Sequence, residues 1–358
     1  MITTRMTALA VCVAAATSVA AQQPQSAGAV TKTAKSYTPP PVFLAEQPLE
    51  VTLVAPFKQL KRDRRGTTPY RPGELLYAGD SGTVRVPVRL RTRGIWRREH
   101  CEIPPLRLNF SKDSTKKTEF RHLDRVRLVL PCRLNDDYEQ YVLREFQLYR
   151  VQRLITPLAL NTRLVHVTYI DAEHRDTLAR RYSFLLEEDQ DFAARQGGKA
   201  LDTKGAAGED LNAEENARFG VFQYFIGNTD FSISALHNVL LFGRDTSYFP
   251  VAYDFDWSGA VNTRYAVPSN LLPIKRVTER IMRGYCVEPS AFEQVFGTFR
   301  QKKDAIYALY APTDAFGALM KPDDVKQTLR YFDQFYDVIN DPRSAKRQIV
   351  DACLGGRA

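Results

Sequence analysis

The sequence predicts an α+β fold built in two lobes, on three observations. Apolar and polar residues alternate from about residue 43 to 135, which is typical of half-buried strands. Longer segments with helical spacing dominate after residue 212, and one helical segment, 138–154, interrupts the strands. Because strands come first and helices later, we expect a β-rich lobe with one helix over residues 43–190 and a helical lobe over residues 191–358.

Residues 1–21 have the three parts of a cleavable export signal. Arg5 supplies positive charge, a short apolar run follows it, and Val19-Ala20-Ala21 offers the small residues that signal peptidase requires. The run is shorter than the about 20 residues that span a bilayer, and no later segment is long enough. We therefore expect an exported protein, periplasmic or extracellular, without a transmembrane segment. Cys12 leaves a lipoprotein open, although Val11 stands where a small residue is expected.

The remaining elements follow in order along the chain. Residues 22–42 are rich in Gln, Ser, Thr, Ala and Pro, a composition that predicts a disordered linker. Alternating or β-branched segments predict strands over residues 49–54, 83–90, 106–110, 126–130, 164–170, 181–186, 239–242 and 249–253. Helical spacing predicts helices over residues 138–154, 212–226, 274–284, 289–309, 321–340 and 344–352. Residues 195–211, rich in glycine and charge, predict a loop.

Four cysteines lie beyond the export signal, at Cys101, Cys132, Cys286 and Cys353. None has the short spacing of a zinc site, and an even number in an exported chain favours disulfides. We expect Cys101 to pair with Cys132 and Cys286 with Cys353, because each pair lies within one half of the chain. Free buried thiols are the alternative.

The whole chain is basic, with 50 Lys and Arg against 41 Asp and Glu and a net charge of +9. Such an excess suits an anionic ligand or surface, and it leaves open that the basic N-terminal part binds an anionic polysaccharide or lipid. The basic residues are interspersed with acids, and no basic motif with interleaved aromatic residues is present. We therefore expect no nucleic-acid partner.

The polar residues that carry chemistry gather between residues 226 and 259. Asp230 lies in a loop after a buried helix, Asn238 opens the next strand, Asp254 ends the strand after that, and Asp256 follows. Because a hairpin brings the start of one strand beside the end of its partner, we expect these side chains to converge. Carboxylate and amide oxygens hold Mg²⁺ together with substrate phosphates, and one remaining acid can orient an attacking hydroxyl.

Other interpretations of these residues stay open. Asp-Phe-Asp after a strand is often a solvated turn or a cap for a following helix. Asp230 facing Asp254 or Asp256 across a cleft also describes a glycosidase, although the amides Asn228 and Asn238 fit metal ligation better. The sequence contains no HExxH, GxSxG, GxGxxG or P-loop motif.

The order of three short motifs resembles the spore-coat protein H (CotH) family of atypical kinases, and most of all its exported bacterial relatives of unassigned role. The motifs are Asn228-Thr229-Asp230, His237-Asn238 and Tyr253-Asp254-Phe255-Asp256. Further shared segments are residues 91–94, 101–108, 126–129, 141–145 and 184–188. The resemblance covers about residues 85–270. It implies a two-lobed, atypical protein-kinase-like fold that binds Mg²⁺ or Mn²⁺ and ATP or another nucleotide.

The resemblance also implies roles for individual residues. Asp230 would be the catalytic acid, while Asn238 and Asp254, with Asp256 beside them, would hold the metal. Glu145, on the first long helix, would pair with a strand cation that touches the nucleotide phosphates.

The nucleotide side of the implied site departs from the family pattern. Arg127 stands where the family has a lysine, and the planar, forked guanidinium is not equivalent to an ammonium group. Arg107 is a second candidate for the phosphate contact, and Arg93 lies in an Arg-Gly turn that can approach phosphates. Glu187 would line the pocket for the base.

The sequence therefore favours an exported, metal-dependent phosphotransferase or nucleotidyl transferase that acts on an unknown protein or glycan acceptor. The alternative is a non-catalytic, pseudokinase-like binding or scaffold protein of the cell envelope. Arg127 in place of the expected lysine is the observation behind that alternative.

Overall fold

The computed structural model describes residues 37–355. The expected export signal, residues 1–21, and most of the expected linker lie outside the described residues. The described part begins with a 3₁₀ helix, Pro41–Phe43, whose Val42 is buried and donates its backbone N–H to the carbonyl oxygen of Glu119 at 2.9 Å. The last residues of the predicted linker therefore contact the folded part of the chain.

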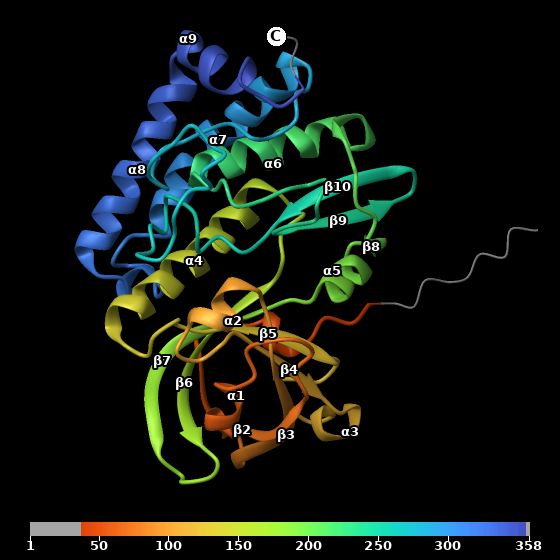
Figure 1. Ribbon diagram of the computed structural model, residues 1–358, viewed down its shortest axis with the longest axis vertical. Helices are drawn as coiled ribbons and strands as arrows, with labels where there is room; N and C mark the ends of the chain where they lie inside the picture. The colour runs from red at the N-terminus through yellow and green to blue at the C-terminus, as the bar shows by residue number, and fades with distance from the viewer. Residues whose placement is uncertain (1–36, 356–358) are drawn as a thin grey trace, which may run out of the picture. The chain divides into compact units, whose positions relative to one another are not determined.

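Within residues 37–355, seven strands close into a barrel in the order β1-β2-β3-β4-β5-β7-β6 (Figure 1). The strands are β1 (Leu49–Ala55), β2 (Arg71–Gly79), β3 (Gly82–Thr92), β4 (Leu106–Phe110), β5 (Arg125–Val129), β6 (Thr162–Asp171) and β7 (Thr177–Leu186). Closure depends on β1, which pairs antiparallel with β2 and parallel with β6. Alternate residues of each strand fill the interior with apolar side chains, such as Leu53, Val86 and Leu108.

The chain that follows the barrel builds a second sheet and the longer helices. This sheet has the order β10-β9-β8, from β8 (Lys199–Leu201), β9 (Val239–Arg244) and β10 (Ser247–Ala252). The longer helices are α4 (Asp136–Ile155), α6 (Ala213–Ile226), α7 (Pro289–Ala308) and α8 (Pro322–Asn340). Short helices are α1 (Phe57–Leu60), α2 (Trp96–His100), α3 (Lys112–Thr115), α5 (Asp189–Arg195) and α9 (Pro342–Ala345). The apolar faces of the longer helices form a core separate from that of the barrel.

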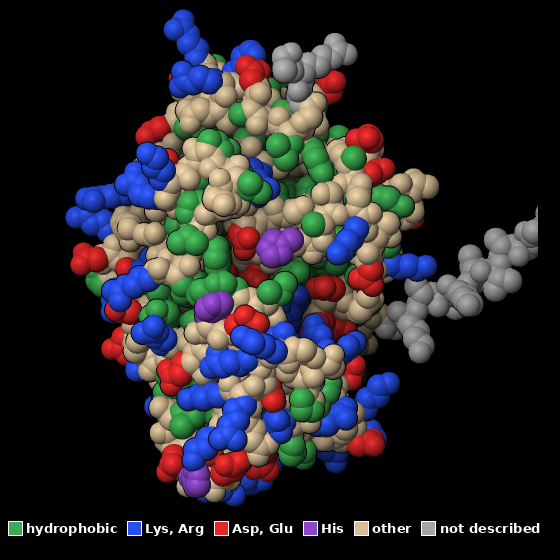
Figure 2. Space-filling view, in the orientation of Figure 1, with side chains coloured by type: hydrophobic (Ala, Val, Ile, Leu, Met, Phe, Trp, Pro, Cys, Tyr) green, Lys and Arg blue, Asp and Glu red, His purple; other side chains and the backbone are tan. Residues whose placement is uncertain are grey.

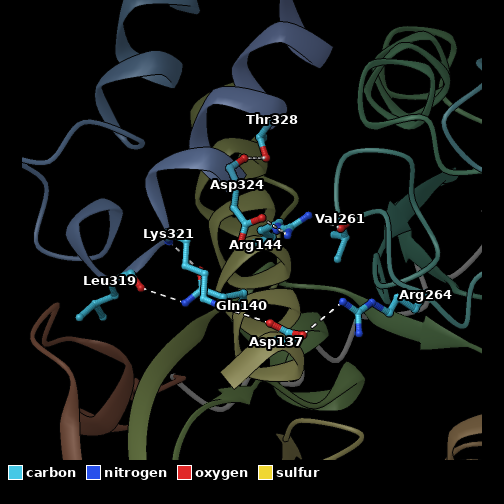
Figure 3. Close-up of polar contacts among 9 residues, drawn as sticks. All are labelled: Asp137, Gln140, Arg144, Val261, Arg264, Leu319, Lys321, Asp324 and Thr328. Atoms are coloured by element: carbon cyan, nitrogen blue, oxygen red, sulfur yellow. Dashed lines mark hydrogen bonds and ion pairs between the residues drawn. The ribbon is translucent and has the colours of Figure 1, made fainter. Parts of the chain in front are cut away.

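Helix α4 carries polar side chains into the interior of the protein. Asn135 caps its N-terminus, and the side chain of Asn135 accepts the backbone N–H of Tyr138 at 3.2 Å. Arg144 donates to the carbonyl oxygen of Val261 at 2.8 Å and to Asp324 of α8 at 2.5 Å (Figure 3). These bonds fix the rotation of α4 about its axis, and so they set the direction in which the next residue, Glu145, points.

Gln140 of α4 adds a second link to the start of α8. Its side chain donates to the carbonyl oxygen of Leu319 at 3.2 Å and accepts the backbone N–H of Lys321 at 2.8 Å (Figure 3). The buried amide is thus satisfied on both sides, which is the condition for burying it without a large free-energy cost.

The expectation of a two-lobed, kinase-like fold with a helical second lobe is wrong. The first part of the chain closes into a mixed seven-stranded barrel, and the second part contains a sheet of its own. Two features hid this from the sequence. Strand β2 contains Pro72 and Gly73, which are depleted in strands. The parallel pairing of β1 with β6 joins residues more than 100 positions apart, and no local sequence pattern predicts it.

Most individual elements agree with the sequence. The predicted strand 106–110 is β4, and the predicted helices 289–309 and 321–340 are α7 and α8. The helix predicted over residues 274–284 is wrong, because these residues form turns and irregular backbone. The predicted loop 195–211 contains the short strand β8.

The two predicted disulfides are confirmed, Cys101–Cys132 and Cys286–Cys353. Among the helices of residues 37–355, none combines the length and the apolar character needed to cross a membrane. The boundary predicted between residues 190 and 191 stays a prediction.

Candidate functional site

A pocket of about 350 Å³ lies between the segment that follows β3 and the segments that flank the β9–β10 hairpin. In Figure 2, acidic side chains gather at a hollow between the barrel and the helices. The predicted site residues that line this pocket are Arg93, Asp230, Asn238, Asp254 and Asp256. Residues from three separate parts of the chain thus meet at one place.

Asp230 is held in place by the segment after helix α6. The helix ends at Gly227 in the left-handed conformation, with φ 62°, and Asn228 Oδ1 then accepts the backbone N–H of Asp230 at 3.0 Å. One carboxylate oxygen of Asp230 lies 3.1 Å from His237 Nε2, and the other accepts a hydrogen bond from Asn238 Nδ2 at 3.0 Å. The hydrogen bond to Asp230 raises the pKa of His237.

Asn238 and Asp254 lie next to each other at the open end of the β9–β10 hairpin: Asn238 precedes β9 and Asp254 follows β10, as the sequence predicted. Their neighbours Val239 and Ala252 face each other in the hairpin register. Both residues have positive φ, 53° for Asn238 and 63° for Asp254, a conformation that Asn and Asp adopt more readily than other non-glycine residues. Asn238 Nδ2 also donates to the carbonyl oxygen of Asp230 at 2.7 Å, so its Oδ1 is the atom left for another ligand.

Three carboxyl groups meet behind this hairpin end. Glu145 of α4 is 1% exposed, and its Oε1 accepts the backbone N–H of Phe255 at 3.3 Å. Burial, followed by the nearby charge of Asp254, raises the pKa of Asp256 to about 7. Burial and the charges of Asp256 and Asp254 also raise the pKa of Glu145. Carboxyl groups that disfavour one another's ionisation are a donor set that a cation would stabilise.

Two arginines bring positive charge to the same pocket. Arg97 of α2 places Nη1 3.7 Å from Asp256 Oδ2, and it also donates to the carbonyl oxygen of Leu130. Arg93 forms no side-chain hydrogen bond or ion pair with any residue between 37 and 355 that the structure describes. Burial, and then the charge of Arg127, lowers the pKa of Arg93. The Arg93 guanidinium is therefore the group in this pocket that is available to an anion.

Arg107 and Arg127 are engaged elsewhere. Arg107 binds Glu188 through two contacts, Nε to Oε1 at 2.8 Å and Nη2 to Oε2 at 2.9 Å. Arg127 is 2% exposed, lies 3.0 Å from Asp189, donates to the carbonyl oxygen of Glu187 and stacks over the Tyr253 ring at 5.3 Å. Neither side chain lines the pocket. The predicted contact of either arginine with phosphates stays a prediction.

The carboxylate of Glu187 likewise has all its hydrogen bonds from groups of the protein. It accepts two hydrogen bonds from Arg195, at 2.9 and 2.8 Å. It accepts two more from Asn161, at 2.8 Å from the backbone and 3.2 Å from the side chain. With 1% exposure and four donors, Glu187 fixes the junction between β7 and α5.

Several residues of the pocket were given no place in the predicted site. A lone histidine such as His237 is more often structural than a ligand, and Arg97 stood out from the sequence only as one of several clustered arginines that could meet anions. The chain contains two tryptophans, Trp96 and Trp257, and both line the pocket with ring centroids 5.6 Å apart. Their positions beside Arg97 and Asp256 were the signal that could have identified them.

A larger groove, of about 730 Å³, lies along helix α8. Its lining includes Arg276, Lys326 and Tyr331 but none of the predicted site residues. The smaller pocket is the candidate site because acids, an amide and the Arg93 guanidinium cluster there, and not because of its volume.

The donor set fits a divalent cation only in part. Within residues 37–355, no group of three or more His, Cys, Asp or Glu side chains is arranged to hold a metal. Magnesium is commonly held by one or two carboxylates, with waters and substrate phosphates completing its shell. Asp254, Asp256 and the free oxygen of Asn238 fit that second arrangement, in which the ligand supplies the missing oxygens.

Comparison with protein-family models and with curated proteins finds no match for this chain.

Proposed function

We propose that the chain is an exported, metal-dependent phosphotransferase or nucleotidyl transferase. The observation that supports this most strongly is the joint lining of one pocket by Asp230, Asn238, Asp254 and the Arg93 guanidinium, which has no side-chain partner among residues 37–355. An anionic donor group that binds a guanidinium and a divalent cation at once would satisfy both sides of this pocket.

Asp230 is the group placed to take the proton of the acceptor hydroxyl. Its two oxygens are oriented by His237 and Asn238, at 3.1 and 3.0 Å, so the carboxylate is fixed without being buried. It lies at the pocket wall, where an acceptor can approach it. Orientation of this kind lowers the entropy that is lost on reaching the reactive geometry.

Asn238, Asp254 and Asp256 would hold Mg²⁺ or Mn²⁺. When bound, the ion would neutralise charge on the phosphate oxygens of ATP or another nucleotide. Arg93 would bind the same phosphates from the barrel side. Glu145 acts as a positioning residue, because its bond to the Phe255 backbone fixes the loop between Asp254 and Asp256.

Transfer of label from ATP tests the proposal and separates its two forms. The purified chain is incubated with Mg²⁺ or Mn²⁺ and with ATP labelled at either the γ- or the α-phosphate, using protein and glycan acceptors. Label from the γ-position indicates phosphoryl transfer, and label from the α-position indicates nucleotidyl transfer. If neither label moves, or if Asp254→Ala transfers as much as the parent, the enzyme proposal fails.

A non-catalytic binding or scaffold function is the second candidate. The observation that favours it is the pairing of Arg107 with Glu188 and of Arg127 with Asp189, which leaves Arg93 to meet phosphates without them. Thermal unfolding distinguishes the two candidates. Nucleotide with metal should raise the Tm of an enzyme through its binding free energy, whereas no response, or a response to metal alone, favours the scaffold.

Export of the chain belongs to the same proposal. The two disulfides, Cys101–Cys132 and Cys286–Cys353, are of the kind that persists in oxidising compartments. Mass spectrometry of the mature N-terminus from the periplasm or medium tests this part. Cleavage after Ala21 supports export, and an intact N-terminus in the cytosol contradicts it.

A further inference from the structure

Arginines recur at every second residue along one end of β3. Val88 and Leu90 point into the barrel and are buried, so Arg89 and Arg91 lie on the outer face. The backbone N–H of Arg93 still bonds to the carbonyl oxygen of Pro105 at 2.9 Å, which continues the pairing past the end of the strand. We call Arg89, Arg91 and Arg93 the arginine track, and it runs from the barrel surface into the pocket.

The first two arginines of the track are held together without acidic partners. Their guanidinium carbons lie 5.4 Å (Arg89) and 4.8 Å (Arg91) from the centroid of the same ring, Tyr70. Among the described residues neither forms an ion pair, and the hydrogen-bond partner of Arg89 is the neutral amide of Asn109. Two like charges over one ring repel each other, and an anion would relieve that repulsion.

The surroundings of the arginine track strengthen its positive potential. Residues 43–135 contain 20 Lys and Arg against 10 Asp and Glu. In Figure 2, Lys and Arg side chains gather over the barrel. Arg91 faces Arg107 in the β3–β4 register, and the ion-pair partner of Glu188 is Arg107 rather than an arginine of the track. The track is therefore a continuous cationic surface that ends at Arg93 in the pocket.

We propose that the arginine track binds an extended acidic polypeptide segment and leads one end of it to the pocket. Successive arginines on one face of a strand are separated by roughly 7 Å, and carboxylates at every second residue of an extended peptide have the same spacing. The guanidinium groups of Arg89 and Arg91 can each bind one carboxylate through two parallel hydrogen bonds, which leaves Arg93 to the phosphates in the pocket. This segment would be the protein acceptor, so the inference rests on the proposed function for what happens at the pocket.

Side chains rather than backbone would make this contact. Strand β3 is paired on both edges, with β2 and with β4, so a peptide cannot add to it as a further strand. The large exposed hydrophobic residues of the described chain are Leu44, Ile95, Tyr248, Val267, Leu271 and Leu354, and none lies on β3. A membrane that must be entered by apolar side chains fits this surface less well than an acidic peptide.

Fluorescence anisotropy with a labelled peptide tests the inference on the full chain. The probe is a 12-residue peptide with Glu and Ser alternating, titrated at low and at moderate salt. The parent should bind it, with affinity falling as salt rises because the contacts are exposed charges. The double variant Arg89→Ala/Arg91→Ala should weaken binding at least tenfold. The charge-matched control Lys326→Ala/Arg330→Ala, on α8, should change it less than twofold.

The result of the titration decides between the possible partners. If both double variants weaken peptide binding equally, the proposed role of the arginine track is wrong, because peptide affinity would then depend only on net charge. Binding of polygalacturonate or anionic vesicles without binding of the peptide would overturn the peptide class. Nucleotide binding, followed in the same samples by the fluorescence of Trp96 and Trp257, reports on the pocket separately. If nucleotide binds and the peptide does not, this inference fails and the proposed function stands.

Discussion

Asn238 donates from Nδ2 to both the carboxylate and the backbone carbonyl oxygen of Asp230, at 3.0 and 2.7 Å. These two residues are eight positions apart and belong to different local structures, a loop after α6 and the start of β9. These two hydrogen bonds join the predicted catalytic acid, Asp230, to a predicted metal ligand, Asn238. They also fix which atom of Asn238 is available to a ligand.

Replacing Asn238 separates the effect of its amide from the effect of its backbone conformation. Asn238→Gly and Asn238→Ala both remove the bonds to Asp230, so both should abolish metal-dependent nucleotide binding. Only alanine adds strain at φ 53°, so Asn238→Ala should be about 1 kcal/mol less stable than Asn238→Gly. Chemical denaturation and a nucleotide titration of both variants measure this. Full nucleotide binding by the glycine variant would show that the amide is dispensable.

Glu187 should matter for stability and not for nucleotide binding. Glu187→Gln removes one acceptor from Arg195 while leaving its guanidinium partly buried, and we expect a loss of about 3 kcal/mol in the free energy of unfolding. Glu50→Gln, which breaks an exposed ion pair with Arg180, is the control and should cost less than about 1 kcal/mol. A Glu187→Gln variant that unfolds normally but loses nucleotide affinity would place Glu187 in the binding site instead.

Asp191 should make stability fall as the pH rises through the mildly acidic range. Burial, followed by the charges of Glu187 and Glu188, raises its pKa from 3.8 to about 6 in the folded chain. The folded state therefore holds a proton that the unfolded state has lost between these values. The stabilising contribution is complete below about pH 4 and is lost as the pH rises through 6.

Asp191→Asn removes this titration while keeping the size of the side chain. Relative to the parent, the variant should gain roughly 1–2 kcal/mol between pH 4 and pH 8. Urea unfolding at both pH values measures the difference. A constant difference between the variant and the parent at the two pH values would contradict the raised pKa.

The Cys286–Cys353 disulfide should stabilise the end of the chain without affecting the pocket. It closes a separation of 67 residues, for which the chain-entropy model gives about 4 kcal/mol. Around it, Cys286 donates its backbone N–H to Leu354 at 3.0 Å and Leu354 donates to Gly284 at 2.8 Å. The double variant Cys286→Ser/Cys353→Ser should lower stability by an amount of this order and keep nucleotide affinity. A loss of affinity at a temperature where the variant is folded would link this region to the site.

Local patterns predicted the elements and the meeting of the hairpin ends. Asn238 and Asp254 flank two segments that alternate as strands, and hairpin geometry brings their ends together wherever such a hairpin forms. The disulfides were predictable for a similar reason, since each joins cysteines within one half of the chain.

Long-range pairing was not predictable in the same way. The parallel register of β1 with β6 closes the barrel but leaves no periodic signal in either segment. Arg107 and Arg127 pair with Glu188 and Asp189, which directly follow β7. The positions of these two acids relative to the arginines are set by the closed barrel. The sequence therefore singled out these charged residues, but it could not say which of them face the pocket and which are paired within the protein.

Nucleotide binding, followed by the fluorescence of Trp96 and Trp257, tests the function of the pocket most directly. The parent, Asp254→Asn and the control Asp245→Asn are titrated with ATP in the presence and absence of Mn²⁺. The control makes the same charge change at an exposed turn of the same hairpin, also at positive φ. We predict Mn²⁺-dependent binding by the parent and by Asp245→Asn, and at least a tenfold weaker affinity for Asp254→Asn. An ATP affinity that is the same with and without Mn²⁺, or equal affinities of the three proteins, would contradict a metal–nucleotide site in this pocket.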